Sequence, residues 1–208
     1  MENKSFEKEF IKESGVYKTK VTILKAAAQE FANKGYGGTA IRNIATVAGV
    51  PHSSITYHFG NKKDLFETVV GNLFQETFNI SNTFKIESSS KNIKQEFIDY
   101  LNQVAIFYYE NPEFLTIIHR ERMDVDEPLQ IISKDLRKLK DLVRGHLIKG
   151  QELGLFKEIP IDSLQLLFSG AFQSLFVSKD FNLSKLSKKK VNEVILNHVT
   201  YVVELLEK

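Results

Sequence analysis

The sequence lacks cysteine and tryptophan, and it holds only four prolines among its 208 residues. Without cysteine the chain forms no disulfide bonds and no thiolate metal sites, which is compatible with a reducing cytoplasmic compartment. No apolar run reaches the roughly 18 residues that a membrane-spanning helix needs. The first ten residues are rich in charge and lack the apolar segment of a signal peptide. We therefore expect a cytoplasmic chain that does not enter a membrane.

Patterns of catalytic chemistry are also missing from the chain. No compact Ser-His-Asp arrangement, no paired carboxylates and no metal-ligand spacing stand out. The histidines His58, His119, His146 and His198 are scattered, and no His-x-x-x-His pair occurs. We therefore expect a protein that is not an enzyme and that holds no metal and no cofactor.

The small net charge of +2 conceals a basic segment near the N-terminus. Residues 15–63, called the basic segment below, hold seven basic residues and one acidic residue, which makes a net charge of +6. Residues 64–208 hold 18 basic and 21 acidic residues, which makes a net charge of −3. This asymmetry indicates a polyanion as partner, although a solvated basic surface has the same composition.

Apolar residues recur with helical spacing along nearly the whole chain, and no alternating strand pattern is convincing. The first predicted helix covers residues 16–33 and is followed by Gly35, and a second helix is predicted between the cap residue Thr39 and Gly49. Further helices are predicted over residues 52–59, 62–78, 113–123, 128–153, 162–179 and 188–207, with a Ser-rich loop at residues 81–91. Another helix is predicted from the apolar stripe between Ile93 and Tyr108, which ends at Asn111–Pro112. The predicted fold class is therefore all-α, with about nine helices.

Residues 49–59, GVPHSSITYHF, combine a turn signal with a short polar helix. Ile55 and Phe59 lie four residues apart and anchor one face of this helix. The other face carries hydrogen-bonding side chains: His52, Ser53, Thr56 and Tyr57. Two short helices joined by a glycine turn in a basic segment are typical of a helix-turn-helix, whose second helix enters the DNA major groove. A surface turn with chance polar residues is the alternative.

Residues 39–66, TAIRNIATVAGVPHSSITYHFGNKKDLF, resemble the DNA-binding signature of the TetR family of bacterial transcriptional repressors. The resemblance lies in the cap Thr39 and in four short strings: IA at 44–45, AGV at 48–50, YHF at 57–59 and NKKDLF at 61–66. With the first helix it covers residues 17–66. Pro51, Thr56 and Lys63 depart from the family pattern, which usually has Ser or Thr, Tyr, and an acidic residue at these positions.

The resemblance implies a homodimeric repressor that binds a palindromic operator in double-stranded DNA and leaves it when a small hydrophobic or amphipathic effector binds. The implied domains are an N-terminal tail at residues 1–15, a helix-turn-helix domain at 16–62, a connecting helix at 63–80 and a ligand-binding and dimerisation domain at 81–208. The implied DNA-binding residues are Thr39, Arg42, His52, Ser53, Thr56, Tyr57, His58 and Lys62. Among them Thr39, Tyr57, His58 and Lys62 are expected to contact the phosphate backbone.

The resemblance also implies an effector pocket and a dimer interface in the last domain. The pocket residues are expected to be Phe97, Tyr100, Leu101, Val104, Phe107, Tyr108, Ile118, His119 and Arg122. The interface residues are expected to be Leu164, Leu167, Phe168, Ala171, Leu175, Val194, Ile195, His198 and Val202. His119 and Arg122 offer polar groups to an anionic or carbonyl effector; core packing and surface ion pairs with Glu121 are the alternative. A DNA-binding protein of the same fold without an effector, of an architectural or cell-division type, is the alternative function.

Overall fold

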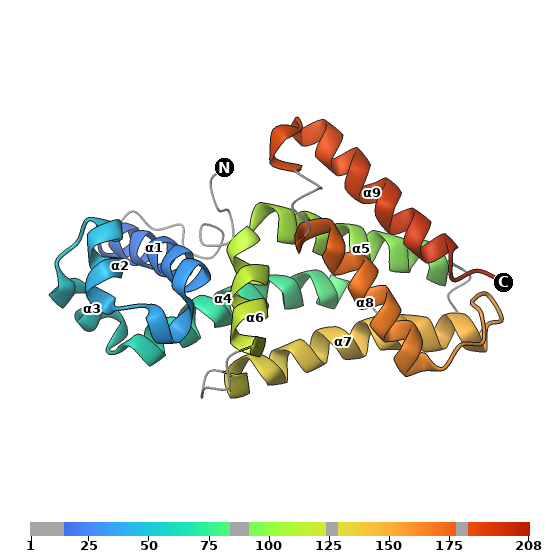
Figure 1. Cartoon of the computed structure of the whole chain (residues 1–208), viewed down its shortest axis with the longest axis horizontal. Helices are drawn as coiled ribbons and strands as arrows, with labels where there is room; N and C mark the ends of the chain where they lie inside the picture. The colour runs from blue at the N-terminus through green and yellow to red at the C-terminus, as the bar shows by residue number, and fades with distance from the viewer. Residues whose placement is uncertain (1–14, 84–91, 124–128, 178–182) are drawn as a thin grey trace. The chain divides into compact units, whose positions relative to one another are not determined.

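The computed structural model of the chain is described here for residues 15–83, 92–123, 129–177 and 183–208. These residues form nine α-helices and one short 3₁₀ helix at Leu183–Lys185 (Figure 1). The α-helices are α1 (Gly15–Gly38), α2 (Ile41–Ala48), α3 (His52–Phe59), α4 (Lys62–Thr83), α5 (Ile93–Glu110), α6 (Pro112–Met123), α7 (Leu129–Glu152), α8 (Ile161–Val177) and α9 (Lys188–Glu204). The all-α prediction is confirmed. No helix of this part of the chain has the length and apolarity to cross a membrane.

Glycines with positive φ end α2 and α7, and a third ends the long first part of α1, where the sequence predicted an end. Gly35 has a φ of 72° and interrupts α1, Gly49 has a φ of 66° after α2, and Gly154 has a φ of 72° after α7. L-residues with side chains rarely adopt this conformation, whereas glycine adopts it at little cost. The predicted ends of these helices are therefore confirmed.

The predicted end of α4 at residue 78 is wrong, because the helix continues to Thr83. Ser81 does not break the helix, since its hydroxyl donates to the Thr77 carbonyl of the preceding turn at 2.9 Å. The first three residues of the predicted loop at 81–91 therefore belong to α4. Residues 84–91 of that loop lie outside the described residues.

The chain divides into two compact units. The first unit combines Met1–Glu76 with Glu110–Leu136, and the second combines Thr77–Tyr109 with Arg137–Lys208. Helices α1, α2, α3 and α6 and most of α4 belong to the first unit, and α8 and α9 belong to the second. The units are defined by contacts between residues and combine separate segments of the chain, so they do not test the predicted domain boundaries at residues 15, 62 and 80. Those boundaries stay predictions.

The core of the first unit forms around α1, which contacts both α2 and α6. Phe31 of α1 is fully buried, and its ring lies edge to face against the buried Phe66 of α4, with 4.9 Å between centroids. Ile44 of α2 and Ile55 of α3 are also buried. Ala45 of α2 is buried beside Ile44. The two short helices are therefore held by these few apolar side chains, because neither helix is long enough to be stable alone in water.

The core of the second unit is a cluster of buried apolar side chains from α5, α7, α8 and α9. Phe156, in the segment after α7, is fully buried in it and packs directly over Gly150. Phe156 also pairs with Glu207 in an isolated antiparallel bridge. The prediction that the last helix runs to residue 207 is wrong, since α9 ends at Glu204 and the chain then joins this bridge.

Candidate nucleic-acid interface

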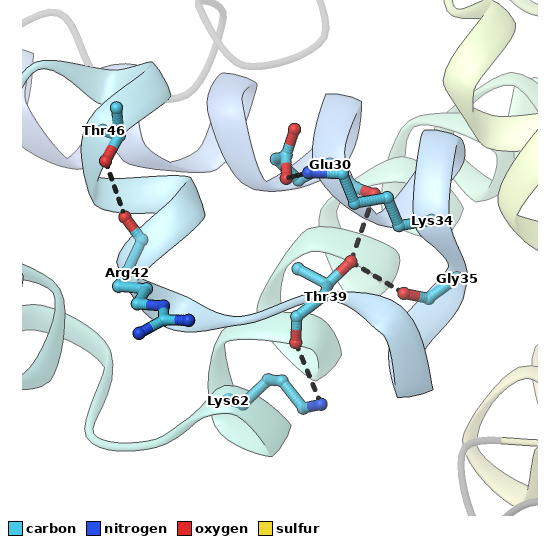
Figure 2. Close-up of polar contacts among 7 residues, drawn as sticks. All are labelled: Glu30, Lys34, Gly35, Thr39, Arg42, Thr46 and Lys62. Atoms are coloured by element: carbon cyan, nitrogen blue, oxygen red, sulfur yellow. Dashed lines mark hydrogen bonds and ion pairs between the residues drawn. The ribbon is translucent and has the colours of Figure 1, made fainter.

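The helix-turn-helix begins at Ala40, the N-cap residue of α2, which has no side-chain hydrogen bond to the helix. The prediction that Thr39 caps this helix is therefore wrong. Thr39 is only 2% exposed, and its hydroxyl lies within hydrogen-bond distance of the carbonyls of Glu30, at 3.1 Å, and Gly35, at 2.7 Å (Figure 2). The physical reason is the break in α1 at Gly35, which leaves carbonyls near the helix end without helical donors.

The turn between α2 and α3 depends on Gly49 and Pro51. The Gly49 N–H donates to the carbonyls of Ala45 and Thr46, which lie at the end of α2 and lack helical donors. Pro51 is the N-cap residue of α3, with a φ of −60° and a ψ of 144°, and it makes no side-chain cap. Its carbonyl accepts the Ser54 N–H at 2.9 Å, which begins the helix. Pro51, which stands where the family pattern usually has Ser or Thr, therefore leaves α3 without a side-chain cap, and the extended proline backbone takes its place.

Helix α3 has one buried face and one free face, as the sequence pattern predicted. Ile55 is 1% exposed and Phe59 is partly buried, whereas Tyr57 is 83% exposed. The exposed hydrogen-bonding side chains of α3 are His52, Ser53, Thr56 and Tyr57. Their hydroxyl and imidazole groups are of the kinds that bind base edges and phosphates.

His58 and Arg42 complete the set of predicted DNA-binding residues on α2 and α3. His58 is partly buried, and its ring lies edge to face against Tyr57, with 5.0 Å between centroids, and against Phe59, with 6.2 Å. Arg42 is exposed on α2, and its carbonyl accepts the Thr46 hydroxyl at 3.0 Å (Figure 2). The exposed guanidinium of Arg42 and the paired rings of Tyr57 and His58 therefore lie on the same short helix-turn-helix.

Lys62, at the start of α4, is partly buried and is engaged within the chain. Its Nζ donates to the carbonyl of Tyr36 at 2.9 Å and to the carbonyl of Thr39 at 3.1 Å, and the second bond is drawn in Figure 2. The same nitrogen lies 4.4 Å from the centre of the Tyr36 ring. The ammonium that was predicted to contact a phosphate is therefore directed at the end of α1.

Asn61 and Asp64 cap the first turn of α4, a feature that the sequence reasoning missed. The Asp64 N–H donates to Oδ1 of Asn61 at 3.0 Å, and Nδ2 of Asn61 donates to Oδ2 of Asp64 at 2.7 Å. An N-cap residue followed three positions later by an acidic residue is a recognisable helix-start signal, so the spacing in NKKD was sufficient to find it.

The predicted pocket residues divide between the two compact units. The residues on α5 lie in or beside the core of the second unit: Phe97, Tyr100, Leu101, Val104 and Phe107 are buried, and Tyr108 is partly buried. Ile118 is buried and His119 is partly buried on α6, in the first unit. The side chain of Arg122 lies outside the described residues. The aromatic part of the predicted site is therefore a real cluster within one unit.

His146 of α7 belongs to the same aromatic cluster, although the sequence reasoning treated it as one of several scattered histidines. Its ring lies parallel to Phe97, with 5.0 Å between centroids, and parallel to Tyr100, with 5.6 Å. Its Nδ1 is 3.0 Å from the Leu142 carbonyl. Burial lowers the pKa of His146, because the charged imidazolium is disfavoured away from water, and burial raises the pKa of the Tyr100 phenol for the same reason. Both groups are therefore neutral near neutral pH.

The predicted dimer residues on α8 and α9 have different surroundings. Leu164, Ile195 and Val202 are buried in the core of the chain's own unit, so the prediction that they face a partner is wrong. Leu167 is 67% exposed, and three other predicted residues are partly buried: Ala171, Val194 and His198. His198 joins the two helices, since its Nε2 is 3.1 Å from the Ala171 carbonyl. The side chains of Phe168 and Leu175 lie outside the described residues.

Known proteins resemble this chain in sequence and in structure. A family model for "Bacterial regulatory proteins, tetR family" matches residues 23–69. The HTH-type transcriptional repressor NicS of Pseudomonas putida is 29% identical over 145 residues, which are 68% of this chain and 67% of NicS. The probable HTH-type transcriptional regulator YttP of Bacillus subtilis is 23% identical over 145 residues, 69% of this chain and 70% of YttP. The crystal structure of HlyIIR, a hemolysin II transcriptional regulator, has a TM-score of 0.69 at 24% identity and covers 93% of this chain and 99% of HlyIIR.

The match to the family model, together with an exposed helix-turn-helix in a basic segment, identifies the chain as a DNA-binding transcriptional regulator of the helix-turn-helix class. The helix-turn-helix region, residues 23–69, belongs to the TetR family of bacterial regulatory proteins. The predicted family and the prediction that the chain is not an enzyme are both confirmed.

Proposed function

We propose that this chain is a homodimeric repressor that binds a palindromic operator through α3 and is released by a small hydrophobic or amphipathic effector. The observation that carries the proposal is the free face of α3, on which hydrogen-bonding side chains stand exposed above the buried Ile55. A major-groove helix needs this arrangement, because its anchors must lie beneath the side chains that meet the bases. The relative NicS is a transcriptional repressor, which supports repression rather than activation.

The proposed contacts divide between bases and phosphates. His52, Ser53 and Thr56 would meet base edges, and Tyr57 and His58 would meet the backbone. Arg42, which is exposed on α2, would meet either a base edge or a phosphate. The side chain of Thr39 is left out of the proposed contacts, because it is buried and its hydroxyl bonds within the chain.

The proposed dimer would form through α8 and α9, with a revised set of side chains. On α8, one exposed helical face carries Ser163, Leu166, Leu167 and Gly170. Leu166 is 76% exposed and Leu167 is 67% exposed, and on α9 Tyr201 is 63% exposed. Neighbouring large apolar side chains at a surface are typical of an interaction site. A palindromic operator requires two symmetric copies, which supports a twofold mate on this face.

The proposed effector site is the aromatic cluster of the second unit. Phe97, Tyr100 and His146 supply parallel rings, and apolar walls with few polar groups are usual for small-molecule sites. Release would require that the effector binds the DNA-free state more tightly than the DNA-bound state. The second candidate function is DNA binding by the same fold without an effector. A small molecule retained by the purified chain in native mass spectra would favour the first function over the second.

Specific DNA binding tests the main proposal directly. Fluorescence anisotropy would be measured with labelled duplexes that tile the DNA flanking the chain's own gene, against scrambled duplexes of equal composition. We expect one duplex to bind with a Kd of about 10 nM or tighter, at least about a thousandfold more tightly than its scrambled control. The affinity should fall steeply as salt is raised, because phosphate contacts release counterions. Equal affinity for every duplex would contradict operator binding.

The proposed interface predicts that Leu167→Glu disrupts the dimer without unfolding the chain. A carboxylate buried against a second copy would lack a partner, so we expect dimerisation to weaken by about 3 kcal/mol, more than a hundredfold in Kd. Sedimentation velocity measures the change. Leu153→Glu is the matched control, since Leu153 is 45% exposed but lies at the end of α7. A Leu167→Glu chain that stays dimeric at the same concentration as the control would exclude this face.

A further inference from the structure

Three segments that are separate in the sequence meet at Lys62. Its Nζ donates to the carbonyls of Tyr36 and Thr39, at 2.9 Å and 3.1 Å. Thr39 in turn directs its hydroxyl to the carbonyls of Glu30 and Gly35 (Figure 2). The end of α1, the connection to α2 and the first turn of α4 are therefore joined by bonds from side chains to the backbone.

The surroundings of the Lys62 ammonium suit a cation that stays in place. The Tyr36 and Thr39 carbonyls follow the break at Gly35, and carbonyls near a helix end carry partial negative charge. The Tyr36 ring centre lies 4.4 Å from Nζ, within the roughly 6 Å range of a cation–π contact. A lysine has three N–H donors, and two of them are directed to these carbonyls.

One turn after Lys62, Phe66 of α4 packs against the Tyr36 ring. Phe66 is fully buried, and its ring lies 5.1 Å from the Tyr36 ring and 4.9 Å from the Phe31 ring, edge to face with both. Lys62 and Phe66 are four residues apart, so both reach the end of α1 from one face of α4. The position of the Lys62 ammonium is therefore set by a packed aromatic group.

We propose that Lys62 is a positioning residue for DNA binding, which holds the Thr39 carbonyl and thereby the start of α2 rather than contacting a phosphate. The proposal rests on the proposed operator binding. Thr39 directly precedes Ala40, the N-cap residue of α2, and α2 contacts α3. A shift of the Thr39 carbonyl therefore alters how the exposed side chains of α3 are presented to DNA.

Lys62→Met tests this role, because methionine keeps an apolar stem and removes the ammonium. We expect the Kd for DNA to rise about tenfold, since two charge-assisted hydrogen bonds are lost from the start of α2. The slope of log affinity against log salt should stay within about 0.3 of the wild-type slope, whereas one lost phosphate contact lowers it by about 0.9. In the DNA-free protein, amide hydrogen exchange at residues 39–44 should become about tenfold faster.

Two further variants separate geometry from charge. Lys63→Met removes the same charge from the next, exposed residue, so exchange at residues 39–44 should match the wild type. Lys62→Arg keeps the charge, but a planar guanidinium does not fit the place of a compact ammonium between two carbonyls. We expect this variant to bind DNA about threefold or more weakly, whereas a phosphate contact would tolerate arginine.

The outcomes distinguish this role from the proposed function. A Lys62→Met slope lowered by about 0.9, with wild-type exchange, overturns the positioning role in favour of a phosphate contact. If the wild-type chain binds no DNA specifically, operator binding fails, while exchange in the free protein still tests whether Lys62 holds the start of α2. If Lys62→Met does not fold, wild-type DNA affinity of Lys62→Arg overturns the positioning role.

Discussion

Tyr57→Ala is expected to weaken operator binding by about 2 kcal/mol, or about thirtyfold in Kd, with no change in the thermal stability of the free protein. Tyr57 is 83% exposed, so little of its side chain packs within the chain. Its ring lies edge to face against the His58 ring. A large exposed aromatic side chain on the free face of α3 has its main energetic role in a complex. Anisotropy with the specific duplex and a thermal melt of the free protein measure the two quantities.

Tyr57→Phe serves as the matched variant, because it removes only the hydroxyl. If the hydroxyl donates to a phosphate, the phenylalanine variant should lose most of the affinity that alanine loses. If the ring packs against a sugar or a base, the phenylalanine variant should stay near the wild type. Unchanged affinity in Tyr57→Ala would contradict a role for the free face of α3 in DNA binding.

Gly150→Ala is expected to lower the free energy of unfolding by about 3 kcal/mol. A Cβ at Gly150 would lie 2.0 Å from Cδ2 of Phe156, far inside van der Waals contact. Phe156 is fully buried and close to Phe97, with 6.4 Å between ring centroids, so the core leaves its ring little room to move. The backbone adds to the constraint, since the N–H groups of Leu155 and Phe156 both donate to the Gly150 carbonyl. Urea denaturation measures the loss.

Gly71→Ala is the control for the glycine substitution itself. Gly71 also lies inside a helix, but a Cβ there would meet no atom within 4 Å. Because alanine has the higher helix propensity, this variant should be more stable than the wild type by about 0.5–1 kcal/mol. Wild-type stability of Gly150→Ala would show that Phe156 can move aside and would contradict the proposed packing.

The helix-turn-helix was predictable because its determinants are local. Gly49 and Pro51 act on their own backbone, and the four-residue spacing of Ile55 and Phe59 is sufficient to orient α3. The exposure of Tyr57 follows from that orientation. The start of α4 at Lys62 was equally local and was predicted, although its cap by Asn61 and Asp64 was not.

The side-chain partners of the predicted site were not predictable in the same way. A threonine before a helix is a good cap in isolation, yet Thr39 bonds to α1 because the break at Gly35 brings carbonyls within reach. A lysine at a helix start is a good phosphate ligand in isolation, yet Lys62 reaches carbonyls 23 and 26 residues earlier in the chain. Competition between partners distant in the sequence decided both cases.

Local sequence features were sufficient for the helical class, the break in α1, the ends of α2 and α7, and the free face of α3, since glycine, proline and apolar periodicity act over a few residues. The tertiary structure alone decided which apolar side chains of α8 and α9 are core. Leu164 and Ile195 are buried while Leu166 and Leu167 are exposed, although the pattern offers all four as apolar. The burial of an apolar side chain depends on which helices pack around it, and the hydrophobic effect does not specify a partner. Only the packing therefore distinguishes the chain's own core from the surface that a second copy would cover.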